Sequence, residues 1–329
     1  MEQEMQPQEF KSRIELTKLR QSADEIRSEL GQIIVGQHQM IDLLLVGLLS
    51  DGHLLIEGVP GIAKTLTAKL LAKTLSIKFS RIQFTPDLMP SDVIGTTVFN
   101  LKNSEFEFHP GPIFANIVLI DEINRAPAKT QAALFECMQE KQVTIDGKTY
   151  PLPPPFIVLA TQNPVEQEGT YRLPEAQLDR FMCKIEITYP AHEEEVSILK
   201  NHHSQKGNFS PNRIKEILSA EQILALRNIV QEVQVEDKLI EYIAAIVNKT
   251  RGHKSLYLGA SPRASIAILT GAKAYAAING RDFITPDDVK FIAAPVLIHR
   301  IMLTPEKEME GLNTANVVQQ ILDSIEVPR

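Results

Sequence analysis

Short apolar segments alternate with helical patterns over the first 190 residues of the chain. The expected strands are 53–57, 79–84, 116–120, 156–160 and 184–189. Three of them are almost wholly apolar, which is typical of strands in a parallel sheet that helices cover on both faces. Apolar residues also recur at helical spacing in 8–30, 65–74, 129–140 and 174–180. This alternation predicts a doubly wound α/β domain.

The pattern becomes helical after residue 190. Apolar residues recur every three or four positions in 221–233, 237–249, 262–278 and 286–297. Ser261 and Thr285 each precede a proline. Such a pair begins a helix, because the hydroxyl caps free N–H groups while the proline occupies the first turn. We therefore expect an α/β domain over residues 1–190 and an all-helical domain over residues 191–329.

Two insertions in the first domain predict β-hairpins. In 141–152, the pair Asp146-Gly147 lies between short alternating runs, which is a strong signal for a tight hairpin turn. In 96–109, residues 102–104 separate two runs that contain valine and phenylalanine. The two hairpins interrupt an otherwise regular alternation of strands and helices, and so they indicate a particular subfamily rather than a generic α/β domain.

The composition excludes several classes of protein. The 329 residues are 43% hydrophobic and 23% charged, which is ordinary for a globular chain. The formal net charge is −7, so no global basic field favours nucleic acid or an anionic membrane. The N-terminus is polar and acidic, unlike a signal peptide, and no apolar stretch approaches the ~20 residues that span a bilayer. We expect a cytoplasmic protein without membrane insertion or bound nucleic acid.

A glycine-rich segment links the first expected strand to the helix after it. In such a loop several N–H groups point at phosphate oxygens, and the helix N-terminus assists. Lys64 would neutralise the β- and γ-phosphates, and the Thr65 hydroxyl would bind Mg²⁺. The predicted nucleotide-binding residues are Gly58, Val59, Pro60, Gly61, Ile62, Ala63, Lys64, Thr65 and Leu66. The alternative, a glycine turn that begins an ordinary helix, is disfavoured by this strand–loop–helix context.

Polar residues also follow two of the apolar strands. Asp121 and Glu122 would lie at the carboxyl edge of the sheet, where ligands of such folds bind. Asp121 would hold the Mg²⁺ shell, and Glu122 would polarise the attacking water as a general base. Asn163 can hydrogen-bond water or the γ-phosphate. Taken singly, the carboxylates fit a solvated turn and Asn163-Pro164 fits a turn, so their meaning depends on the phosphate loop.

Two arginines complete the candidate catalytic residues. Arg180 ends a short predicted helix before the last strand, and Arg263 lies in the first turn of a helix in the second domain. The helix dipole disfavours a cation at a helix start. An anionic ligand explains Arg263, because the dipole and the guanidinium then act on the same phosphate. A surface ion pair is the alternative for either arginine.

These residues resemble the MoxR family of AAA+ ATPases, from Ile34 to Arg300. The matching motifs are IVGQ at 34–37, GVPGIAKT at 58–65, GPIFANIVLIDEINRAP at 111–127, ATQNP at 160–164, RLPEAQLDRF at 172–181 and GASPRAS at 259–265. One departure from the commonest loop is Ala63, where glycine is usual. The family's loop often carries alanine there, which implies that the departure has no cost.

The resemblance implies a sheet of strand order 5-1-4-3-2, a helical lid, and a nucleotide between the two domains. It implies that Ile34 and Val35 line the adenine pocket, and that ATP and Mg²⁺ are the cofactors. Asn163 would be sensor 1 and Arg263 sensor 2, while Arg180 would be the arginine finger that reaches the neighbouring subunit's nucleotide. Family members form ring-shaped, usually hexameric, chaperone-like ATPases. They work with proteins that bear von Willebrand factor A domains, so a protein client is expected.

Other functions fit part of the pattern. A metal-chelatase motor subunit would differ mainly in its client. A DNA translocase shares the two hairpins, but the net charge and the lack of interleaved basic and aromatic residues in them argue against it. Glu122, Asn163 and Arg180 argue against a nucleotide-gated scaffold without turnover. Because Arg180 would act on a neighbour, we expect slow hydrolysis by an isolated subunit, and Arg125 is a candidate for the subunit interface.

Overall fold

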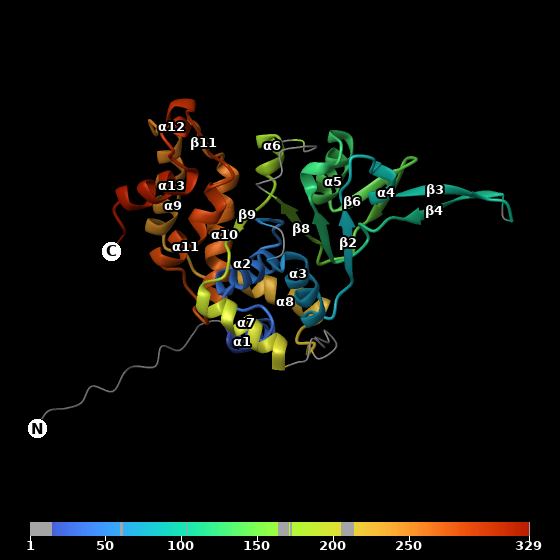
Figure 1. Ribbon diagram of the computed structural model, residues 1–329, viewed down its shortest axis with the longest axis horizontal. Helices are drawn as coiled ribbons and strands as arrows, with labels where there is room; N and C mark the ends of the chain where they lie inside the picture. Colours follow the sequence, from blue (N-terminus) through green and yellow to red (C-terminus); the bar gives the residue numbers. More distant parts are fainter. Residues whose placement is uncertain are drawn as a thin grey trace, which may run out of the picture.

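The computed structural model describes residues 15–59, 62–102, 104–163, 171, 173–204 and 214–328. At the centre of the fold lies a five-stranded parallel sheet with the order β2-β5-β8-β1-β9. Its strands are β1 (Leu54–Gly58), β2 (Phe79–Gln83), β5 (Ile117–Asp121), β8 (Ile157–Gln162) and β9 (Cys183–Ile187). Numbered along the chain and read from β9, the order is 5-1-4-3-2, so the predicted sheet is confirmed (Figure 1).

Helices cover both faces of the sheet because alternate strand residues enter two hydrophobic cores. Leu54 and Ile56 of β1 belong to one buried cluster, and Leu55 between them belongs to the other. The helices of this domain are α1 (Thr17–Gly31), α2 (His38–Leu49), α3 (Lys64–Thr74), α4 (Pro90–Ile94), α5 (Ala128–Glu140) and α6 (Glu175–Leu178), with a 3₁₀ turn at Ile123–Arg125. The first three pack in the first cluster and α5 in the second, so the sheet is buried between them.

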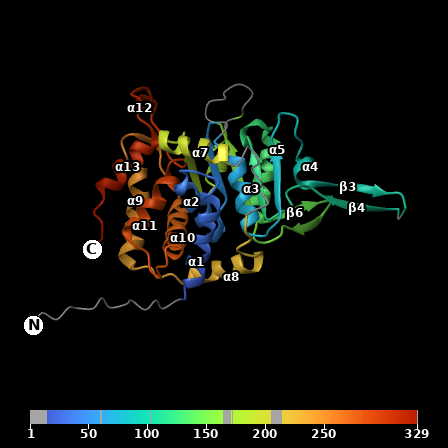
Figure 2. The same cartoon turned by 60° about the horizontal axis from the view of Figure 1, so that its bottom comes forward.

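Two antiparallel hairpins lie at the insertions that the sequence indicated. β3 (Gly95–Asn100) pairs with β4 (Glu105–Pro110), and β6 (Gln142–Ile145) pairs with β7 (Lys148–Pro151). The β3–β4 hairpin extends beyond the body of the molecule (Figure 2). The Phe108 ring of β4 stacks on the Tyr150 ring of β7 with centroids 4.2 Å apart, so the two hairpins are in contact.

The C-terminal part is a bundle of helices. They are α7 (His192–Ser204), α8 (Ala220–Gln231), α9 (Asp237–Arg251), α10 (Pro262–Ile278), α11 (Pro286–Leu297), α12 (Pro305–Met309) and α13 (Thr314–Ser324). Thr285 and Asp288 form the capping box predicted at the start of α11. A short antiparallel sheet that the sequence did not indicate pairs β10 (Leu256–Leu258) with β11 (Met302–Leu303). No helix in the described part of the chain is long and apolar enough to cross a bilayer.

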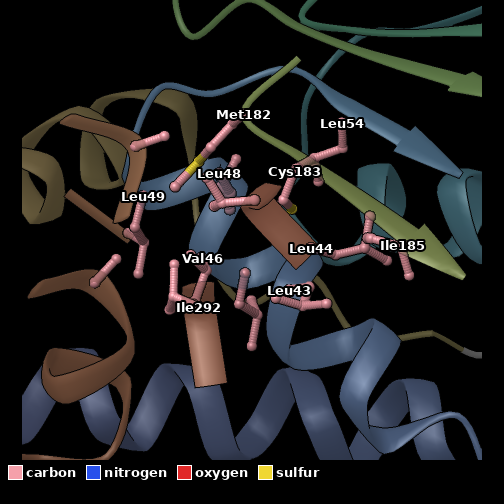
Figure 3. Close-up of a cluster of buried hydrophobic side chains, with 14 of the residues drawn as sticks. Leu43, Leu44, Val46, Leu48, Leu49, Leu54, Met182, Cys183, Ile185 and Ile292 are labelled. Carbon is pink, nitrogen blue, oxygen red and sulfur yellow. The ribbon is translucent and has the colours of Figure 1, made fainter. Parts of the chain in front are cut away.

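This helical lid packs on the core through α2 and β9. Figure 3 shows leucines of α2 beside Ile292 of α11, with Met182 and Ile185 from the β9 segment close by. All of these side chains are buried. Because α10 also packs against both α2 and α11, the lid and the core share one continuous hydrophobic cluster.

His53, directly before β1, is buried and joins α5 to β8. Its Nδ1 accepts from the Val158 N–H at 3.0 Å, so its Nε2 carries the proton and donates to the Met138 carbonyl at 2.9 Å. Both ring nitrogens are thus satisfied in the neutral form. Burial of the ring lowers the pKa of His53 to about 4.

We expect the free energy of unfolding to fall as the pH drops from about 6.5 to about 4. The unfolded chain protonates His53 first, so stability is lost over this window, by about 3 kcal/mol. Urea titrations of the wild type and of His53→Gln at both ends of the window measure the effect. The wild type should lose more stability than the variant, and an equal loss in both proteins would contradict the assignment.

Candidate nucleotide-binding site

Ala63 and the first residues of α3 form one wall of a pocket at the carboxyl edge of the sheet. Lys64, the first residue of α3, donates from Nζ to the Gly58 carbonyl at 2.6 Å. Gly58 has no room for a side chain, because a Cβ there would lie 2.4 Å from Ile62 Cδ1 and 2.9 Å from the Ile187 carbonyl oxygen. The close approach of Ile62 and β9 to Gly58 therefore requires glycine at the end of β1.

Ala63, directly before Lys64, has a left-handed backbone with φ 60° and ψ 19°. Glycine enters this region freely, whereas a Cβ costs about 1–2 kcal/mol. The expectation that alanine has no cost at this position is therefore wrong. The loop therefore holds backbone strain at the residue directly before α3.

Ala63→Gly should raise the free energy of unfolding by about 1 kcal/mol, because relief of the left-handed strain exceeds the added freedom of the unfolded chain. Urea denaturation measures the change. Ala132→Gly, at an exposed position within α5, is the matched control and should instead lower stability by about 1 kcal/mol. A loss of stability in Ala63→Gly would show that the loop does not need this conformation.

Asp121 ends β5 and faces the start of α3. Its Oδ2 accepts from the Thr65 hydroxyl at 3.3 Å and from Arg81 Nε at 2.6 Å, and its Oδ1 accepts from the Thr161 hydroxyl at 3.1 Å. A hydroxyl and a carboxylate are hard oxygen ligands of the kind that Mg²⁺ takes together with phosphate and water. Thr65 and Asp121 therefore fit the predicted metal site, and Arg81 provides positive charge beside the same carboxylate.

Glu122 turns away from the strand because its backbone is left-handed, with φ 57°. Its N–H donates to Thr161 Oγ1 at 3.0 Å. Its Oε2 accepts from Gln83 Nε2 at 2.8 Å and pairs with Arg125 Nε at 3.1 Å. The side chain is 32% exposed, so water reaches the carboxylate. Arg125 thus contacts the candidate base within this chain, and its role at a subunit interface stays a prediction.

A pocket of about 390 Å³ lies between the loop and the carboxylates, within the range of roughly 300–1,000 Å³ that is usual for small-ligand sites. The predicted residues that line it are Ala63, Lys64, Thr65, Leu66, Asp121, Glu122 and Asn163. The sequence analysis missed three more, which are Arg81, Gln83 and Thr161. Gln83 pairs with Asp121 in the sheet register, and Arg81 lies two residues earlier on the same face of β2. Arg81 and Gln83 could have been found from the strand order, which places β2 beside β5, and from the alternation of side chains along β2.

The two predicted arginines lie elsewhere. Neither is among the described residues that line the pocket. Arg180 donates from Nη1 to the Phe135 carbonyl at 2.8 Å, and its guanidinium lies over the Phe135 ring. Arg263 forms an ion pair with Asp179 at 3.7 Å. Arg180 thus lies within the segment between α6 and β9, and Arg263 pairs with a residue of the same segment.

The remaining predicted residues that the structure describes do not line the pocket either. Ile34 is buried in the hydrophobic core, and Val35 is half-buried beside it. Val59 is half-buried in the segment after β1. Pro60 and Gly61 lie outside the described residues. The adenine-binding role of Ile34 and Val35 therefore stays a prediction.

Comparison with known proteins decides the family. The model of the ATPase family associated with various cellular activities (AAA) matches residues 53–183, and the model of the AAA lid domain matches residues 248–321. Chaperone MoxR1 of Mycobacterium tuberculosis is 44% identical over 310 residues, which cover 92% of this chain and 81% of that protein. The chain belongs to the MoxR family of AAA+ ATPases.

Two further similarities support this assignment to the MoxR family. Protein YeaC of Bacillus subtilis is 47% identical, over 91% of this chain and 92% of its own. The crystal structure of a candidate ATPase from Cytophaga hutchinsonii is 46% identical, with a TM-score of 0.88 over 95% of this chain and 97% of that one. The predicted AAA+ core with a helical lid is thereby confirmed, and this MoxR-family chain is an ATPase.

Proposed function

We propose that this ATPase binds ATP with Mg²⁺ in the 390 Å³ pocket and hydrolyses it at the subunit interfaces of a homo-oligomeric ring, with six subunits as in most of its family. The energy of hydrolysis would remodel a protein client, together with a partner that bears a von Willebrand factor A domain. The observation that carries the proposal is the convergence of Lys64, Thr65, Asp121, Glu122 and Asn163 on one pocket.

Each residue of the pocket has a chemical role in this proposal. Lys64 exchanges the Gly58 carbonyl for phosphate oxygens, which are stronger acceptors because they are charged. Thr65 and Asp121 hold Mg²⁺, which when bound neutralises charge on the β- and γ-phosphates. Glu122 takes a proton from the attacking water, and Asn163 holds that water or the γ-phosphate by a hydrogen bond.

Arg180 would complete the site of the neighbouring subunit. It contacts Phe135 and does not line the pocket of its own chain, which supports action in trans. Phosphoryl transfer depends mainly on positioning and neutralisation of charge, and a supplied arginine is worth about 10³–10⁵ in rate. Hydrolysis should therefore rise with assembly.

The projecting hairpin favours a protein rather than a nucleic acid as the client. Leu101 and Phe106 at its outer end are 85% and 70% exposed, and Val98 and Phe99 are each 46% exposed. Exposed apolar side chains gathered on one element mark a surface that contacts protein. A track for nucleic acid would instead interleave basic residues with the aromatic ones.

Lys64→Ala tests the proposal directly. Loss of a charged hydrogen bond to phosphate should weaken ATP binding by about 10- to 150-fold and remove turnover. Calorimetry with ATP and Mg²⁺, together with a phosphate-release assay over a range of protein concentrations, measures both effects. Lys69→Ala, an exposed lysine one turn later on α3, is the matched control and should bind and hydrolyse like the wild type. Unchanged ATP affinity in Lys64→Ala would contradict the proposed site.

A further inference from the structure

Asp179, which directly precedes Arg180, is held by three side chains of the lid. Its carboxylate accepts from Arg300 Nε at 2.8 Å and from the Ser261 hydroxyl at 3.0 Å, and it pairs with Arg263 at 3.7 Å. Ser261 is the N-cap of α10, and Arg300 follows the end of α11. The carboxylate beside the candidate finger is therefore a junction between the core and two ends of lid helices.

Arg300 reaches further into the same junction. Its side chain is 3% exposed, and besides Asp179 its guanidinium donates to the carbonyls of Phe181 at 2.5 Å and Met182 at 2.8 Å. It also donates to the Val296 carbonyl near the end of α11 at 2.7 Å. Its Nη2 also donates to the Asp179 carbonyl at 3.2 Å, so one buried lid side chain binds three backbone carbonyls of the turn in which Arg180 lies.

This arrangement is poorly explained by stability alone. A buried guanidinium and carboxylate lose much of their attraction to the desolvation of both charges, and apolar residues of similar volume are often as stabilising. The Arg300–Asp179 pair instead specifies the conformation of the turn at residues 179–182 and attaches this turn to the lid. At the other end, Arg180 rests on Phe135 of α5, and its buried Nε has no hydrogen-bond partner in the structure. The guanidinium of Arg180 is therefore incompletely satisfied where it lies.

We propose that Asp179 is a positioning residue, held by Arg300 and Ser261 of the lid, so that the lid of one subunit sets where that subunit's Arg180 meets the nucleotide of its neighbour. This inference rests on the proposed action of Arg180 in trans. A displacement of α10 or α11 moves Asp179, and with it the adjacent Arg180. The state of one subunit's lid is thereby transmitted to the site of the next subunit.

A mixed assembly tests the inference. The first parent, Glu122→Gln, has an inactive site but an intact finger, and the second, Arg180→Ala, has an intact site but no finger. Random mixing in equal amounts should restore about a quarter of the active interfaces of a head-to-tail ring. No recovery of ATP turnover in this mixture would contradict the trans action of Arg180 and overturn the inference with it.

Asp179→Asn is then added to one parent at a time. In the Glu122→Gln parent, which donates the finger, it should lower the recovered turnover by about 10- to 100-fold. Misplacing a catalytic group by about 1 Å lowers the rate by up to this factor. In the Arg180→Ala parent, which donates no finger, it should leave the recovered turnover unchanged. A purely structural role predicts the same loss in both parents. Equal loss in both, or no loss in the donor, overturns the inference.

Two controls keep the result decisive. Asp323→Asn, at an exposed lid carboxylate that accepts from Gln319, should change neither mixture. Ser261→Ala removes the hydrogen bond to Asp179, together with the N-cap bond of α10 that is lost equally in both parents, and it leaves the buried ion pair intact, so it serves if Asp179→Asn does not fold. It should lower turnover by about 2- to 10-fold in the finger-donating parent alone. Equal loss in both parents overturns the inference here too.

Discussion

Arg180→Ala is expected to lower ATP turnover of the assembled protein by about 10³–10⁵-fold while ATP affinity changes little. The reason is geometric, because Arg180 does not line the pocket of its own chain and so contributes little to holding its own nucleotide. Phosphate release measured against protein concentration should rise steeply for the wild type and stay flat for the variant.

Arg20→Ala is the matched control for this experiment, since Arg20 is an exposed arginine on α1 that pairs with Asp24. It should reproduce the concentration dependence of the wild type. Thermal unfolding of both variants checks that loss of the contact with Phe135 does not explain the result. Full turnover in assembled Arg180→Ala would show that another group neutralises the transferred phosphate.

Glu122→Gln is expected to bind ATP but to hydrolyse it about 10²–10⁴-fold more slowly, since the amide cannot accept a proton from water. The substitution preserves the shape of the side chain and an oxygen that accepts from Gln83, so the pocket should keep its form. Single-turnover hydrolysis separates the chemical step from binding, and ATP should remain bound on the variant.

The control for this variant is Glu140→Gln, an exposed carboxylate at the end of α5. It should hydrolyse ATP at the wild-type rate. If Glu122→Gln kept turnover within a factor of two of the wild type, a different group would have to activate the water, and the role of Glu122 would be limited to its contacts with Gln83 and Arg125.

Local patterns were enough to predict the five strands and most of the pocket, whereas the order of the strands followed from the family resemblance. Asp121 ends β5 and Glu122 follows it, while Lys64 and Thr65 begin the helix that follows β1, so their place at the sheet edge follows from their own segments. Arg81 could not be found from its own segment, because its partner Asp121 is 40 residues away. The two residues come together only through the pairing of β2 with β5.

The contacts between the lid and the core could not be predicted from local sequence patterns. Arg300 and Asp179 are 121 residues apart, and nothing near either residue signals the other. The motif around Arg180 pointed to the finger, but which lid side chains hold its turn depends on how α10 and α11 pack on the core. The left-handed backbone at Ala63 was also hidden, since alanine gives no signal for that conformation.

The stacked rings of Phe108 and Tyr150 connect the projecting β3–β4 hairpin to the β6–β7 hairpin. Such a pair stabilises by about 0.5–1.5 kcal/mol beyond its buried area, so the stack favours a fixed arrangement of the two hairpins. The β6–β7 hairpin follows directly after α5, and the Phe135 carbonyl of α5 accepts a hydrogen bond from Arg180 Nη1. The projecting hairpin is therefore connected through two successive contacts to the turn that holds Arg180, within the same chain.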